Sequence, residues 1–95
     1  MIAVHPGRIL KRELLARGLS ANQLALSLRL PSGRITDILN GKRGVSPDTA
    51  LRLARYFGNS AKFWLNLQTG FELAVAERET GSRIAEEVKP APIAA

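Results

Sequence analysis

Apolar residues recur at intervals of three and four positions through most of this chain, and no stretch alternates between apolar and polar residues. The first spacing is that of a helix with one buried face, whereas alternation would indicate a half-buried strand. With 95 residues, the chain is long enough for one domain and too short for a second core. The sequence therefore predicts one small all-α domain.

Capping residues divide this apolar pattern into five helices. Serine caps the free amides at a helix start, proline suits the first turn, and glycine favours the left-handed conformation at a helix end. The expected helices begin near Pro6, Ser20, Ser32, Ser46 and Ser60 and end near Gly18, Leu28, Asn40, Gly58 and Gly81. Residues 82–95 show no helical pattern, so we expect a domain of residues 1–81 followed by a flexible tail.

The helical spacing also assigns one buried face to each helix. The expected core residues are, in chain order, Ile9, Leu10, Leu14, Leu15, Leu24, Ala25, Leu28, Ile35, Ile38, Leu39, Ala50, Leu53, Ala54, Phe57, Phe63, Trp64, Leu67, Phe71 and Ala74. The fifth helix is longer than four short helices can cover. We therefore expect its surplus apolar residues Phe71, Leu73 and Val75 to form a dimer seam.

The second and third expected helices are short and are joined by only about three residues. Two helices joined in this way meet at a steep angle, as in a helix-turn-helix. The small side chain of Ala25 lets the two helices approach closely, and Leu24 and Ile35 supply apolar contacts between them. The sequence therefore predicts a helix-turn-helix whose recognition helix spans residues 32–40.

Most of the positive charge lies in the first two thirds of the chain. The net charge is +6 overall, +7 for residues 1–60 and −1 for residues 61–95. This distribution indicates a polyanionic partner, such as a nucleic acid, for the first two thirds. Charge alone is equally compatible with a basic surface that is simply solvated. The prediction of a nucleic-acid partner therefore depends on the helix-turn-helix.

The recognition helix presents five outward or leading-edge positions once its apolar face is buried. Its expected base-contacting residues are Ser32, Gly33, Arg34, Thr36 and Asp37. Arg34 can bind guanine through two hydrogen bonds, Thr36 can touch a thymine methyl group, and Asp37 can accept from a cytosine amine. The alternative for Arg34 is a solvent-exposed arginine or one paired with Asp37. Just past the helix, Asn40, Lys42 and Arg43 are placed for phosphates, which set position rather than sequence.

Other kinds of function find no support in the sequence. The chain has no cysteine, so disulfides and cysteine-based zinc fingers are excluded. His5 is the only histidine, directly precedes a helix-starting proline, and is expected to cap that helix or lie on the surface. No metal-ligand spacing and no membrane-spanning apolar run occurs. We expect no catalytic residue, cofactor, metal or membrane association, and a cytoplasmic location.

Several segments resemble known DNA-binding proteins. Residues 20–53 resemble the Xre/phage-repressor class of helix-turn-helix domains, whose fold is a five-helix, lambda repressor-like domain. Residues 5–15, 40–58 and 63–73, with the run FWLNLQ from Phe63 to Gln68, are similar to the HigA/VapI family of addiction-module antitoxins. The resemblance implies a homodimer that binds a palindromic operator, represses its own operon and neutralises a HigB-type, RelE-like ribonuclease toxin.

The resemblance also implies roles for individual positions. Ser32, Gly33, Arg34 and Asp37 would face bases, and Gln23, Asn40, Lys42 and Arg43 would face phosphates. The chain departs from the wider class in having Gly33 where a base-reading polar residue is common and Pro31 where Ser or Thr often caps the recognition helix. Two alternatives stay open, namely a stand-alone Xre-type repressor without a toxin and a helical protein-interaction module with an incidental basic face.

Overall fold

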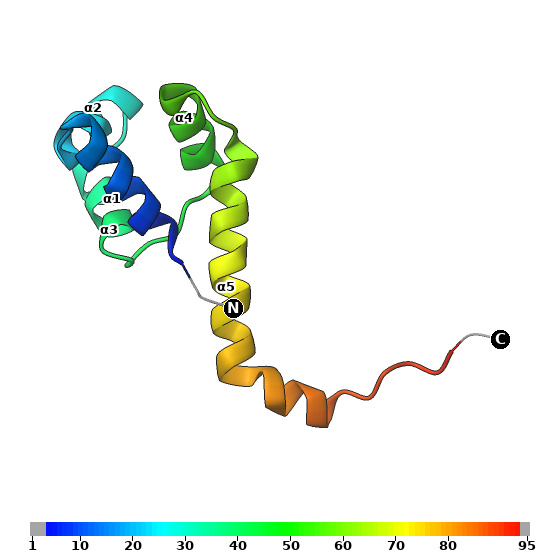
Figure 1. Cartoon of the computed structure of the whole chain (residues 1–95). Coiled ribbons are helices and arrows are strands. Elements are labelled where there is room, and N and C mark those ends of the chain that lie inside the picture. The colour runs from blue at the N-terminus through cyan, green and yellow to red at the C-terminus, as the bar shows by residue number, and fades with distance from the viewer. Residues whose placement is uncertain (1–3, 94–95) are drawn as a thin grey trace.

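The computed structural model describes residues 4–93, and this part of the chain contains five helices and no strand. The helices are α1 (Pro6–Arg17), α2 (Ala21–Leu28), α3 (Ser32–Leu39), α4 (Pro47–Phe57) and α5 (Ala61–Glu87). Figure 1 shows α1 to α4 gathered beside the first half of α5, while the second half of α5 extends away from them. The predicted all-α fold with a helix-turn-helix at α2 and α3 is confirmed.

The helix starts follow the predicted capping chemistry. The Ser20 hydroxyl accepts a hydrogen bond from the amide of Gln23 at 3.1 Å, and the Gln23 side chain accepts one from the amide of Ser20 at 2.8 Å. Ser46 and Ser60 cap α4 and α5 in the same position. These bonds satisfy amides that have no partner inside the helix, so the helix starts are fixed by local sequence.

The turn between α2 and α3 is fixed by an unusual backbone conformation. Arg29 has a φ of 60° and is the only residue other than glycine with a positive φ in the described part of the chain. The amide of Leu30 donates to the carbonyl of Ala25 at 2.9 Å, and Arg52 of α4 donates to the carbonyl of Leu28 at 2.9 Å. The end of α2 is therefore held both by its own turn and by α4.

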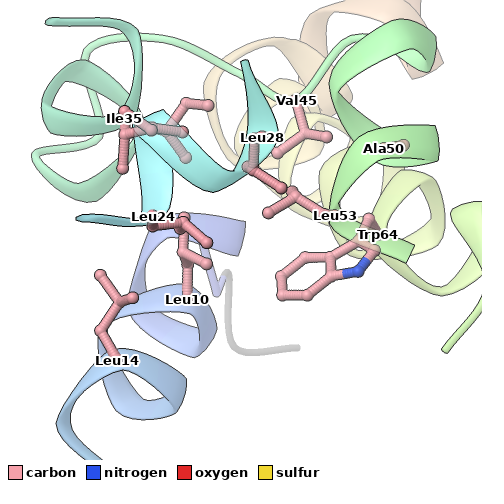
Figure 2. Packing of buried hydrophobic residues seen from close by; sticks show 11 residues of the cluster. Leu10, Leu14, Leu24, Leu28, Ile35, Val45, Ala50, Leu53 and Trp64 are labelled. Carbon is pink, nitrogen blue, oxygen red and sulfur yellow. The ribbon is translucent and has the colours of Figure 1, made fainter. Parts of the chain in front are cut away.

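A single apolar core joins all five helices. Its buried residues are Leu10, Leu14, Leu24, Ala25, Leu28, Ile35, Ile38, Val45, Ala50, Leu53 and Trp64. Figure 2 shows Leu10 and Leu24 on the side of α1 and α2, and Leu53 between Leu28 and the Trp64 ring. The Trp64 indole is fully buried and donates to the side-chain oxygen of Asn59 at 2.9 Å, so its one polar group is satisfied. The predicted core role of Trp64 is confirmed.

Eight of the predicted core residues are less buried than the helical spacing predicts. Leu15 is 75% exposed and Phe63 is 42% exposed. Six others are only half-buried, namely Ile9, Leu39, Ala54, Phe57, Leu67 and Phe71. Periodicity marks a wide apolar arc on each helix, but in a domain of this size neighbouring helices cover only part of that arc. The core prediction is therefore wrong for Leu15 and Phe63 and only partly right for the six half-buried residues.

Helix α5 is longer than the sequence predicts. It ends at Glu87 instead of Gly81, so residues 82–87 belong to the helix and the predicted start of the tail is too early. Glycine lowers helix stability by about 1 kcal/mol relative to alanine, but it ends a helix only where it takes a left-handed conformation. Gly81 does not take one, and Figure 1 shows α5 continuing, with a bend, into its orange end. No described helix is both long and apolar enough to cross a membrane.

Candidate DNA interface

Helix α3 has one buried face and one polar, exposed face. Ile35 and Ile38 are fully buried against the core, and Ser32, Gly33 and Thr36 are exposed on the other side. The polar edge that the sequence predicts for this helix is therefore free of the rest of the described chain. A major groove about 12 Å wide admits one such helix.

Arg34 and Asp37 flank this exposed edge and are both half-buried. No ion pair within residues 4–93 includes Arg34, so the alternative of an Arg34–Asp37 pair is wrong. The Nε atom of Arg34 is the only buried side-chain nitrogen or oxygen without a hydrogen-bond partner in the described residues. Buried donors of this kind are rare in folded proteins because leaving them unpaired costs free energy, and they often mark a functional group.

The start of α3 offers free backbone donors. Pro31 occupies the N-cap position and makes no side-chain cap, unlike the serines at the starts of α2, α4 and α5. The amides of Ser32 and Gly33 therefore have no acceptor from a cap or from within the helix. Together with the positive end of the helix dipole, such amides favour an anion.

The predicted phosphate-contacting side chains all lie on the surface. Asn40, Lys42 and Arg43 are exposed on the turn that follows α3, and Gly41 takes a φ of 74° within that turn. Gln23 is exposed at the start of α2. Its oxygen is used by the cap of α2, which leaves its amide nitrogen as a donor for an outside acceptor.

Three basic residues of α1 form a second exposed group that the sequence analysis did not single out. Arg8, Lys11 and Arg12 line an open cavity of about 430 Å³ together with Leu15 and Leu39. Their spacing places them on one face of α1, since residues three and four apart are neighbours on a helix. The spacing is visible in the sequence, but only the packing of α1 on α3 shows that they lie beside the recognition helix.

A larger cavity of about 600 Å³ lies between α2 and α4 and is lined by Arg29, Arg52 and Arg55 among others. Arg52 is already committed there, because it binds Asp48 at 2.9 Å and the carbonyl of Leu28 at 2.9 Å. At least one lining residue of this cavity, Arg52, therefore has a structural role, because it holds the end of α2 against α4.

His5 performs the predicted capping role at the start of α1. Its Nδ1 atom accepts a hydrogen bond from the amide of Gly7 at 2.9 Å, and its ring meets the ring of Phe71 edge-on with 4.9 Å between centroids. Burial lowers the pKa of His5, and a hydrogen bond to the backbone of Arg43 opposes this shift. His5 thus links the start of α1 to α5.

The residues predicted for the dimer seam on α5 differ in their exposure. Phe71 is half-buried against His5, Val75 is half-buried, and Leu73 is 52% exposed.

No group of three or more potential metal ligands occurs among the residues that the structure describes. The described chain thus brings the candidate DNA-contacting residues together around α3 and keeps Leu73 apart from them on α5.

Comparison with known proteins identifies the family. A helix-turn-helix family matches residues 10–64 of the chain. Virulence-associated protein I of Dichelobacter nodosus is 49% identical over 83 residues, which cover 86% of this chain and 77% of that protein.

Two solved structures closely match the whole fold. An addiction module antidote protein of the HigA family from Coxiella burnetii is 48% identical, with a TM-score of 0.92 over 96% of this chain and all of that one. The antitoxin HigA of Pseudomonas aeruginosa, solved with the higBA promoter, is 40% identical with the same TM-score and the same coverage. The chain therefore belongs to the helix-turn-helix family, within the group of HigA antitoxins and virulence-associated protein I.

Proposed function

We propose that this protein is an antitoxin that binds its own operator, represses its operon and neutralises a toxin encoded beside it. The observation that carries the DNA-binding part is the exposed polar edge of α3, with an uncapped amino end and a basic turn behind it. The P. aeruginosa HigA structure, which holds promoter DNA, supports the same role for a chain of the same fold. The proposal assigns no catalytic step, cofactor or metal to the protein, and it places the protein in the cytoplasm with the DNA.

In this proposal, the bases are contacted from the leading edge of α3. The contacting residues are Ser32, Gly33, Arg34, Thr36 and Asp37. Arg34 carries the largest share of sequence recognition, because it is half-buried at the edge of α3 and its planar guanidinium can pair with two acceptors of guanine. Gly33 contributes its backbone amide and lets the backbone come close to the DNA, since nothing lies within 4 Å of the position that its Cβ would take.

The phosphates are contacted on both sides of α3. Gln23 reaches one strand from the start of α2, while Asn40, Lys42 and Arg43 reach a phosphate run from the turn after α3. These contacts supply affinity that does not depend on sequence and that weakens with salt, because each neutralised phosphate releases counterions.

A palindromic operator requires two recognition helices about one DNA turn apart, so we propose a homodimer. Phe71, Leu73 and Val75 form its seam, and the half-exposed Leu73 is the residue with most apolar surface to bury there. A HigB-type, RelE-like ribonuclease is the proposed toxin, because both solved relatives are named as antidote or antitoxin.

Salt titration of DNA binding tests the proposal. The operator is obtained by selecting bound duplexes from a random pool, and its affinity is measured by fluorescence anisotropy at several salt concentrations. Replacing Lys42 with alanine should lower the slope of log affinity against log salt by about 0.9, the value for one phosphate. Lys62→Ala on α5 is the matched control and should leave the slope unchanged. Equal binding to operator and unrelated duplex would reject sequence-specific recognition. If no salt-dependent DNA binding is found, the helical protein-interaction module is the alternative that remains.

Co-purification separates an antitoxin from a stand-alone repressor. The protein is tagged and expressed from its natural operon together with the neighbouring reading frame. If the protein is an antitoxin, a small partner protein should co-purify with it, and the ribonuclease activity of that partner should be suppressed in the complex. Operator binding without any co-purified partner would instead favour the stand-alone repressor.

A further inference from the structure

A side chain of α5, that of Gln68, is hydrogen-bonded to the turn between α3 and α4. The side-chain oxygen of Gln68 accepts a hydrogen bond from the amide of Val45 at 2.8 Å, across 23 positions of sequence. Val45 is 96% buried in the core, so its amide would have little access to water if this bond were absent. The proposed phosphate-contacting residues Lys42 and Arg43 lie on the same turn, three and two positions before Val45.

The Gln68 side chain has little freedom to do anything else. A Cβ atom on Gly44 would lie 2.7 Å from the amide carbon and nitrogen of Gln68, so glycine at this position lets the side chain lie against the backbone. The amide nitrogen of Gln68 donates to Glu72 at 2.7 Å. Both ends of the amide are thus occupied, and its orientation is set from two sides.

The other end of the turn is also fixed by backbone contacts. The carbonyl of Asp37 in α3 accepts hydrogen bonds from the amides of Lys42 at 2.8 Å and Arg43 at 3.2 Å. On α5, the ring of Phe71, one turn beyond Gln68, meets the ring of His5 edge-on. The backbone of the turn is therefore held at both ends, while the side chains of Lys42 and Arg43 stay exposed.

We propose that Gln68 is a positioning residue for DNA binding. It holds the turn between α3 and α4 in one conformation, so the backbone that carries Lys42 and Arg43 is already ordered before these side chains bind phosphates. The inference rests on the proposed function, in which these two side chains bind phosphates. A backbone that is already fixed loses less conformational freedom on binding, so a larger part of the contact energy appears as affinity. Gln68 acts through the turn and has no contact with DNA of its own.

Gln68→Leu removes the acceptor and keeps a side chain of similar size. The expected result is a folded protein with about 3- to 10-fold weaker operator binding, because the released turn must then be ordered when it meets the DNA. The slope of log affinity against log salt should also fall, by up to about 1.8 if both phosphate contacts are lost. Asn66→Ala, an exposed change on the same helix, should alter neither quantity.

Rescue separates positioning from general destabilisation. Gln68→Glu keeps an acceptor for Val45 but places a carboxylate beside Glu72, so it should bind more weakly than the native protein. Adding Glu72→Gln restores a donor and an acceptor in the pair, and operator affinity and slope should return to within about twofold of the native values. Failure of this double variant to recover the slope would contradict the proposal.

A second variant keeps the inference distinct from the proposed function. In a protein already carrying Lys42→Ala and Arg43→Ala, adding Gln68→Leu should cause no further loss, because the residues that it positions are gone. A full additional loss, or weaker binding with an unchanged slope, would overturn the positioning role while leaving operator binding intact. Absence of any salt-dependent binding by the native protein would instead overturn the proposed function itself.

Discussion

Gly7 of α1 lies against the backbone of Ile38 in α3, so closely that a Cβ atom on Gly7 would overlap the Ile38 carbonyl oxygen and stand 2.9 Å from its carbonyl carbon. Both residues are buried. The contact brings the first turn of α1 onto the last turn of the recognition helix with no side chain between them. The orientation of α3, and with it the exposed edge proposed to read DNA, therefore depends on glycine at position 7.

Gly7→Ala tests this contact. The added methyl group must push α1 away from α3, and overpacking of this kind costs about 1–3 kcal/mol. We expect the free energy of unfolding, measured by urea titration, to fall by that amount. Gly70→Ala is the matched control, because nothing lies within 4 Å of its would-be Cβ and alanine favours the middle of a helix by about 0.5–1 kcal/mol. If Gly7→Ala is as stable as Gly70→Ala, the backbones of α1 and α3 can move apart at little cost, and the predicted loss of stability is wrong.

The helix starts could be predicted from sequence because their causes are local. Ser20 and Gln23 are three positions apart, and no other part of the chain is needed for their reciprocal bonds. The burial of Ile35 and Ile38 followed from helical spacing for the same reason. The end of α5 could not be predicted in this way, since Gly81 is compatible both with a helix end and with the helix that continues through it.

The supports of the candidate interface could not be predicted, because each joins residues far apart in the sequence. Nothing near Gly7 indicates that Ile38 lies over it, and Gln68 is separated from Val45 by 23 positions. The half-buried setting of Arg34 is a further example. Spacing assigned it an outward position, whereas the fold covers its Nε atom and leaves it without a partner. Such features depend on packing between helices, and periodicity describes one helix at a time.

Arg34→Ala should relax sequence recognition at one base pair of each half-site. A guanine contact by two hydrogen bonds is worth about 1–3 kcal/mol of discrimination, so the variant should lose that difference at one position and keep it elsewhere. Arg34→Lys retains the charge without the planar pair of donors and should recover affinity more than discrimination. Binding to a set of operators with single base-pair changes measures both. Unaltered preference at every position would rule out base contact by Arg34.

Protonation of His5 should destabilise the fold. Burial lowers the pKa of His5 below its ordinary value of 6.5, so the folded state favours the neutral ring, whose Nδ1 accepts from Gly7. The stabilising contribution is therefore complete above pH 6.5 and is lost as the pH falls through the lowered pKa. Thermal unfolding between pH 8 and pH 5.5 measures this loss. His5→Asn keeps a capping acceptor that does not titrate, and its stability should vary less over the same range. A native protein with the same pH profile as this variant would remove His5 as the cause.

Leu73→Glu should convert the proposed dimer to a monomer without unfolding it. Leu73 is 52% exposed within one chain, so a charged side chain can stay in water in the monomer but would have to be buried in the dimer. Sedimentation velocity should show about half the native mass, while circular dichroism should show the same helix content. Leu51→Glu on α4, at a position 64% exposed, is the control and should leave the mass unchanged. Operator affinity should fall with dimerisation, because a monomer can occupy only one half-site at a time. A dimer that tolerates Leu73→Glu would place the seam on another face of the molecule.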